Sequence, residues 1–159
     1  MRYIVRQKFF ALGEDNTIDR DDGTPAYRVD GKALSLRNRM DIYDMQGHHV
    51  GAVHRKLVSM LPRYEIELDG GAGAVLQREM SLMHPRWELV AGNESLQLTG
   101  NLLQHDFTFT RGGTPVATVS RAWVTLTSTY GVEVQDGEND LLFLAAVLAL
   151  EADENRDQR

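Results

Sequence analysis

Short segments in which apolar and polar side chains alternate follow one another along most of the chain. Residues 40–43 (MDIY), 64–68 (YEIEL) and 107–110 (FTFT) are examples, with the period of two that a half-buried β-strand requires. Asp-Gly and Gly-Gly pairs, which tolerate the positive φ angles of tight hairpin turns, separate many of these segments. Turn signals at intervals of about 8–12 residues are typical of an antiparallel meander. The pairs lie at 22–23, 30–31, 69–70, 112–113 and 136–137, and no helical pattern precedes residue 138.

A longer repeat underlies this alternation. The segment 62–66 (PRYEI) returns as 85–89 (PRWEL), an offset of 23 residues, and a weaker copy includes 39–42 (RMDI). A unit of this length holds two short strands and two turns, which makes it a hairpin. Because a single hairpin is not stable in water, several units must pack together. The sequence therefore predicts about ten to twelve antiparallel strands, enough for the sheet to curl or close on itself.

The last apolar segment has a different pattern. Ten consecutive apolar residues, 141–150 (LLFLAAVLAL), follow Glu138, Asn139 and Asp140, which are suited to a helix N-terminus. Such a helix is about 15 Å long and has no polar side, so it must be buried all round or lie in a membrane. It is too short to span a bilayer, which takes about 20 residues. We therefore expect a buried C-terminal helix and no transmembrane segment.

Together these features predict the architecture. A closed barrel of about twelve strands has an interior too wide for strand side chains to fill, and a central helix would fill it. We therefore predict an all-β fold with one helix, a closed antiparallel barrel of about twelve strands around the hydrophobic C-terminal helix. The alternative, a helix packed across an open sandwich, would leave part of the helix exposed. We expect one barrel domain over residues 1–150 and a disordered acidic tail over residues 151–159.

Composition limits the chemistry. The chain has 159 residues, no cysteine and a formal net charge of −6. The lack of cysteine excludes disulfides, zinc–thiolate sites and thiol catalysis. The excess negative charge is local, because residues 1–132 hold 15 basic and 15 acidic residues, whereas residues 133–159 hold 2 and 8. The overall balance argues against a nucleic-acid partner, but the neutral body leaves room for a basic surface.

The N-terminal half is similar to a known family. The similarity runs through residues 3–13 (YIVRQKFFALG), 27–36 (YRVDGKALSL) and, most clearly, 54–66 (HRKLVSMLPRYEI). It weakens towards residue 110 and returns in the apolar C-terminal helix. In order and spacing these segments resemble the LURP-one-related family, which belongs with the tubby C-terminal-like proteins.

The resemblance implies a fold and limits the function. It implies a tubby-like barrel of twelve antiparallel strands around a hydrophobic helix, and a family without established enzymatic activity. Relatives include tubby domains, which bind phosphoinositide headgroups through basic residues, and phospholipid scramblases, which act at membranes. Contact with anionic lipids is therefore implied in general terms. No headgroup residue is carried over, because no basic motif here aligns with tubby's, and the chain lacks the scramblases' cysteine cluster and membrane span.

Basic side chains at the ends of the predicted hairpins are the candidate ligand-binding residues. If they gather at one rim of the barrel, they are placed to bind the phosphate oxygens of an anionic headgroup, each contributing about 1 kcal/mol near an anionic surface. The alternative is a set of solvated strand ends paired with Asp41, Glu65 and Glu88. The candidates are Arg37, Arg39, Arg55, Lys56, Arg63 and Arg86.

Other chemistry has less support. The five histidines show no metal-ligand spacing, and His48 and His49 point to opposite faces of a strand unless a turn brings them together. No metal and no cofactor are therefore expected. No Gly-x-Ser-x-Gly motif is present, and residues 70–73 (GGAG) lack the Lys-Ser/Thr of a phosphate-binding loop. The sequence thus predicts a protein that is not an enzyme.

Two functional hypotheses remain. The first is a module that binds anionic phospholipid headgroups or a membrane surface through a basic rim. The second is a protein-interaction or scaffold domain with no lipid ligand. Because Arg6 and Lys8 interrupt any signal peptide and Arg2 excludes N-myristoylation, we expect a cytoplasmic protein, peripheral at the membrane under the first hypothesis.

Overall fold

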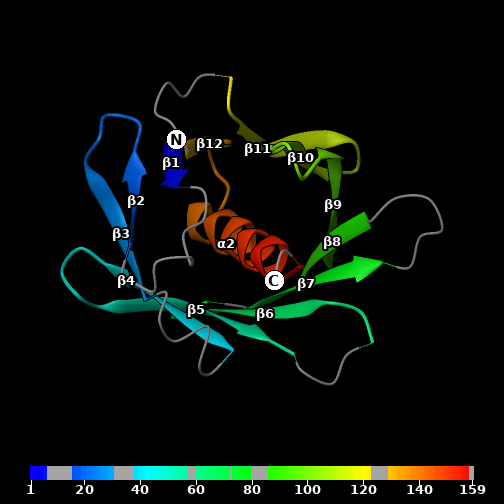
Figure 1. Cartoon of the computed structure of the whole chain (residues 1–159), viewed down its shortest axis with the longest axis horizontal. Helices are drawn as coiled ribbons and strands as arrows, with labels where there is room; N and C mark the ends of the chain where they lie inside the picture. The colour runs from blue at the N-terminus through cyan, green and yellow to red at the C-terminus, as the bar shows by residue number, and fades with distance from the viewer. Residues whose placement is uncertain are drawn as a thin grey trace.

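The fold is a closed antiparallel barrel with a helix through its interior (Figure 1). The computed structural model describes residues 1–6, 16–30, 38–56, 60–71, 73–79, 86–122 and 129–157. Within this part of the chain, twelve strands pair in sequence order, and β1 pairs with β12 to close the barrel. The predicted barrel of about twelve strands around a C-terminal helix is confirmed. No helix in the same ranges is long and apolar enough to cross a bilayer.

The strands have five to eight residues each, and their inward-facing positions are almost all buried apolar side chains. They are β1 (Arg2–Arg6), β2 (Asn16–Arg20), β3 (Pro25–Asp30), β4 (Arg39–Asp44), β5 (His49–Arg55), β6 (Arg63–Leu68), β7 (Ala74–Glu79), β8 (Arg86–Ala91), β9 (Glu94–Asn101), β10 (Asp106–Arg111), β11 (Thr114–Ser120) and β12 (Thr129–Val134).

The two ends of the barrel differ. At one end, here called the turn end, tight hairpin turns join each even-numbered strand up to β10 to the next, and Gly23 and Gly70 adopt the expected positive φ angles of 88° and 75°. The predicted turn at 30–31 extends outside the described residues. At the opposite end, here called the loop end, odd-numbered strands finish and even-numbered strands begin. Arg55 pairs there with Tyr64, and Glu79 with Arg86.

Helix α2 (Asp140–Asp157) enters the barrel from the turn end and finishes at the loop end. The Asn139 side chain accepts a hydrogen bond from the backbone N–H of Leu142 at 3.3 Å, as the predicted helix cap requires. The Tyr3 hydroxyl donates to Asp140 and ties the first turn to β1. Residues 143–150 are all buried. The helix thus serves as the inner half of the hydrophobic core, which explains why it has no polar side.

The sequence repeat corresponds to alternate strands. Its copies are the beginnings of β4, β6 and β8 at the loop end, and in each copy an arginine is the first residue of the strand. The next residue points inward, so Tyr64 and Trp87 meet inside the barrel with ring centroids 6.5 Å apart. Because side chains alternate along a strand, the arginines that precede them point outward.

The prediction of a disordered acidic tail from residue 151 onward differs from the structure. Helix α2 continues to Asp157, and Glu151 and Asp153 are only 4% and 7% exposed. Both carboxylates have partners on distant strands or turns: the Tyr64 hydroxyl donates to Asp153 at 2.9 Å, and His105 Nε2 lies 2.9 Å from Glu151. The boundary at residue 150 was wrong because these partners are remote in sequence.

Leu144, which has no exposed surface, tests the role of the central helix. Leu144→Asp buries an unpaired charge inside the barrel and should cost at least about 3–5 kcal/mol of unfolding free energy or prevent folding, as measured by urea denaturation. The matched control is Met45→Asp on an exposed turn, which should leave stability within about 0.5 kcal/mol. A soluble Leu144→Asp protein with parental stability would contradict the buried helix.

Candidate functional site

The candidate basic residues gather at the loop end of neighbouring strands. Arg39, Arg63 and Arg86 are the first residues of β4, β6 and β8, Arg55 is the last of β5, and Lys56 follows it. The backbone N–H of Lys56 donates to the Arg63 carbonyl at 2.9 Å, which holds these two residues side by side. Arg37 lies outside the described residues. The structure therefore brings five of the six candidates to one end of the barrel.

These five side chains differ in their exposure and in their ion-pair partners. Lys56 lies 3.3 Å from Glu65, an expected partner. Arg55 points inward beside the Tyr64 hydroxyl, and its Nε is buried with no hydrogen-bond partner among the described residues. Arg63 and Arg86 are exposed and form no ion pair with any residue that the structure describes. Among the candidates in the described part of the chain, these two are therefore exposed cations without an ion-pair partner there.

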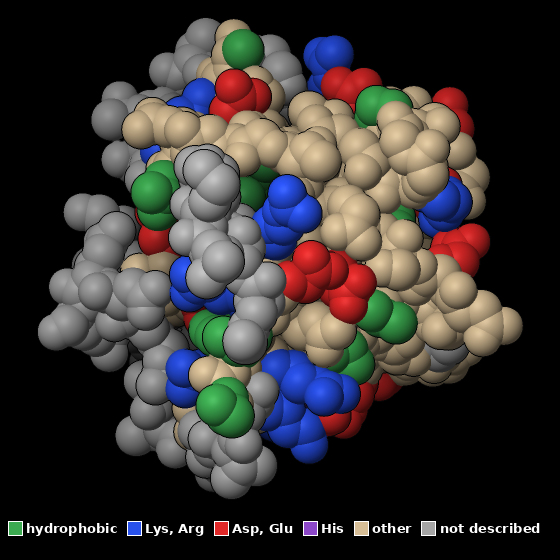
Figure 2. All heavy atoms as spheres, turned by 90° about the vertical axis from the view of Figure 1, so that its right-hand side faces the viewer, with side chains coloured by type: hydrophobic (Ala, Val, Ile, Leu, Met, Phe, Trp, Pro, Cys, Tyr) green, Lys and Arg blue, Asp and Glu red, His purple; other side chains and the backbone are tan. Residues whose placement is uncertain are grey.

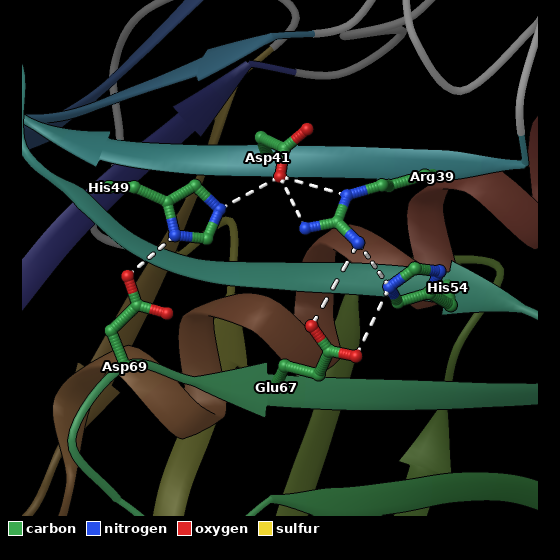
Figure 3. Close-up of polar contacts among 6 residues, drawn as sticks. All are labelled: Arg39, Asp41, His49, His54, Glu67 and Asp69. Carbon is green, nitrogen blue, oxygen red and sulfur yellow. Dashed lines mark hydrogen bonds and ion pairs between the residues drawn. The ribbon is translucent and has the colours of Figure 1, made fainter.

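Arg39 belongs to a polar network on the outer wall of β4, β5 and β6 (Figure 3). One oxygen of Asp41 accepts hydrogen bonds from Arg39 Nε at 3.0 Å and from His49 Nε2 at 2.8 Å. The other ring nitrogen of His49 lies 2.6 Å from Asp69. On its opposite side Arg39 donates to His54 Nε2 at 2.7 Å, and Glu67 lies 3.9 Å from the guanidinium. The ion pair expected for Asp41 is present, and its partner is Arg39, whose guanidinium is therefore already neutralised.

Glu88 does not have the arginine partner that the alternative interpretation expected. Its carboxylate accepts hydrogen bonds from Gln77 and Ser95. On the outer wall that faces the viewer in Figure 2, Lys and Arg side chains lie between Asp and Glu side chains, and no large area carries a single charge. On this face, positive and negative side chains are therefore mixed.

The loop end also carries the most exposed apolar side chains of the described residues. Met60, between β5 and β6, is 100% exposed, and Leu103, between β9 and β10, is 72% exposed. The other exposed large apolar side chains, Met1 and Met45, lie at the turn end. The two most exposed large apolar side chains of the described residues thus lie at the same end of the barrel as Arg63 and Arg86.

A second polar cluster lies inside the loop end, where α2 finishes. His105, in the turn between β9 and β10, has its Nε2 2.9 Å from Glu151 and 3.8 Å from Glu154. Arg121 donates to the other ring nitrogen, Nδ1, at 3.0 Å. Burial, together with the negative charge of Glu151, raises the pKa of the Glu154 carboxyl. Two carboxylates thus lie close together in a largely buried place.

A cavity of about 610 Å³ adjoins this cluster. Apolar side chains from the barrel and from α2, among them Trp87, Phe107 and Leu150, form much of its wall. The ring of Tyr130 stacks on His105 with a centroid distance of 4.4 Å. The hydroxyl group of Tyr130 is buried and has no partner at full hydrogen-bond geometry in the part of the chain that the structure describes. The cavity therefore joins an apolar wall to a compact group of polar atoms.

Sequence reasoning missed this inner cluster. His105 and Glu151 are 46 positions apart, and only the closed barrel brings the turn after β9 to the end of the helix. A local signal was present, because Glu151 and Glu154 are three residues apart and therefore share one face of a helix. That signal lay in a segment predicted to be disordered.

The outer network makes His49 a test of the local electrostatics. Both ring nitrogens face carboxylates, so hydrogen bonds to Asp69 and then to Asp41 raise the pKa of His49 above its usual 6.5. A group whose pKa is raised on folding adds stability that is fully present below pH 6.5 and is lost as the pH rises through the native pKa. An NMR titration should place the His49 pKa above 6.5, and Asp69→Asn should lower it. A native His49 pKa of 6.5 or less would contradict the network.

Comparisons with known proteins agree with this fold. The family model described as LURP-one-related matches residues 1–151. YxjI, an uncharacterised protein of Bacillus subtilis (strain 168), is 24% identical over 148 residues, which cover 93% of this chain and 90% of YxjI. The X-ray structure of a protein from Arabidopsis thaliana is similar with a TM-score of 0.65 at 15% identity, covering 98% of this chain and 91% of the other. With the family model matching nearly the whole chain, this protein belongs to the LURP-one-related family.

Proposed function

We propose that the barrel is a non-enzymatic module that binds anionic phospholipid surfaces with its loop end. The observation that carries the proposal is the position of two kinds of side chain at this one end. Arg63 and Arg86 are exposed and have no ion-pair partner among the described residues, and Met60 and Leu103 are the most exposed large apolar side chains there. Cations and apolar groups side by side match the interface between headgroups and acyl chains.

The spacing of the arginines favours a surface over a single small anion. Arg39, Arg63 and Arg86 begin every second strand, and neighbouring strands are about 4.8 Å apart. The backbones at successive arginines are thus separated by about 10 Å along the rim, and because Asp41 holds Arg39, Arg63 and Arg86 are the two that supply the proposed contacts. A row of this kind suits several headgroups lying in one plane.

The acidic residues of the helix end do not cancel this surface. Glu151 and Asp153 are buried, and they face His105 and Tyr64 inside the barrel. Their charge is therefore directed inward, whereas the arginines that begin β6 and β8 point outward. A protein of this kind would be peripheral at the cytoplasmic side of a membrane, where anionic lipids attract basic residues.

Vesicle co-sedimentation tests the proposal. The protein should sediment with vesicles of phosphatidylserine and phosphatidylcholine at low salt, less at 0.15 M salt, where the Debye length falls to about 8 Å, and not with phosphatidylcholine alone. Arg63→Gln with Arg86→Gln removes two charges worth about 1 kcal/mol each, so partitioning should fall about 30-fold. Met60→Gln with Leu103→Gln should weaken it further, because both apolar contacts are lost.

Variants at the turn end are the matched controls. Arg2→Gln with Arg20→Gln, and Met45→Gln, change the same side-chain types on the opposite end and should leave vesicle binding unchanged. Equal failure to bind every lipid mixture would contradict the proposal, as would equal loss in loop-end and turn-end variants. If lipids fail and a stoichiometric protein partner requires Arg63 and Arg86, the chain is a scaffold domain instead.

A further inference from the structure

Three side chains at the end of the central helix present ligand atoms to one point inside the loop end. They are His105 from the turn between β9 and β10 and Glu151 and Glu154 from α2. We propose that His105, Glu151 and Glu154 form a binding site for a divalent transition-metal ion, best matched by zinc. Its ligand set includes none of the outward arginines of the proposed lipid-binding surface, although Leu103 of that surface lines the adjoining cavity.

The geometry of the donors fits an ion of this size. The ligand atoms of the three residues lie within 4.8 Å of one another. Two ligands bound to one zinc ion, each at about 2.1 Å, are at most about 4.2 Å apart, so small side-chain movements suffice. Imidazole nitrogen with two carboxylate oxygens is a donor set for zinc or manganese. Calcium is a poor match, since it takes about six to eight oxygen ligands.

The Tyr130 hydroxyl is the second observation that points to a ligand. It is buried, has no partner at full hydrogen-bond geometry among the described residues, has the Glu151 carboxylate as its neighbouring acceptor, and belongs to a ring that stacks on His105. The hydroxyl feels the charges of Glu151 and Glu154, so it is directed at the same cluster. A buried polar group without a partner is rare in native proteins. A water molecule bound to the metal would donate a hydrogen bond to this hydroxyl oxygen, as metal-bound waters commonly do to outer-sphere groups.

The cavity beside the cluster supplies room and access. His105, Tyr130, Glu151 and Glu154 all line it, so a metal ion could keep one or more water ligands on that side. Structural zinc sites have four protein ligands, whereas sites with three protein ligands keep a fourth position open for water. The two carboxylates repel each other across this space. A divalent cation between them would attract both, so the net electrostatic energy of the cluster would become favourable.

Arg121 and a metal ion at Nε2 favour different tautomers of His105. An arginine can only donate, so the Nδ1 that receives its hydrogen bond carries no proton, and Nε2–H donates to Glu151. A metal at Nε2 requires the proton on Nδ1, where it would meet the guanidinium donors. Arg121 must therefore turn away when the ion binds. Arg121→Gln removes the competing charge and offers a carbonyl oxygen that accepts the Nδ1 proton.

Isothermal titration of zinc chloride into chelator-treated protein tests the site. The full chain should bind one zinc ion, Glu154→Gln should bind it at least tenfold more weakly, and Arg121→Gln should bind it more tightly. His48→Gln, which removes an exposed histidine beside Asp44, is the control for surface binding and should match the parent. Circular dichroism melts of each variant establish that it is folded.

Several results would overturn the site. No zinc binding by the parent protein would do so, as would parental affinity in Glu154→Gln or loss of binding in His48→Gln. Should Glu154→Gln fail to fold, the comparison with Arg121→Gln decides, because Arg121 is not a ligand. Unchanged or weaker binding in Arg121→Gln would contradict the proposed arrangement of donors around His105.

Discussion

The burial of an apolar helix inside a closed sheet is the constraint on which the rest of the structure depends. Twelve short strands enclose an interior that their own side chains do not fill, and residues 143–150 of α2 occupy it from the inside. Each strand then needs apolar residues on its inner face only. Its outer face is left for polar and charged side chains, which is why short alternating segments cover most of the sequence.

The same constraint divides the charged residues into two populations. Inward positions near the loop end hold polar groups that reach the end of α2, as His105 and Tyr64 do. Outward positions hold the arginines that begin β4, β6 and β8. A negative net charge for the whole chain therefore says little about either surface, since several of the acidic residues lie inside the barrel.

Much of the architecture was predictable because it depends on local periodicity. The alternation of residues 64–68, the Asp-Gly turns and the unbroken apolar run 141–150 each report a short-range property of the chain. The extent of α2 was not predictable in this way. Residues 151–157 have the composition of a solvated tail, and they are held by partners 46 and 89 positions away. The repeat placed the arginines at matching hairpin ends, but it did not predict whether they would meet at one rim or which of them would be paired.

That Arg39 is paired and Arg63 is not reflects the outer neighbours of each strand. Asp41 follows Arg39 by two positions and so lies on the same face, where His49 completes the network. At Arg63 the equivalent residue is Glu65, and this carboxylate lies within 3.3 Å of Lys56 instead. Such choices depend on cross-strand register, which a single sequence does not display.

The pairing of β1 with β12 gives the chain an order of assembly. The amino group of Met1 donates to the Val134 carbonyl at 2.9 Å, across 133 positions, so the first strand has a free edge until nearly the whole chain has been synthesised. The helix that fills the barrel emerges from the ribosome later still. Closure of the sheet through β1 and β12 and filling of its core by α2 both need segments after residue 128, so both are late steps of folding.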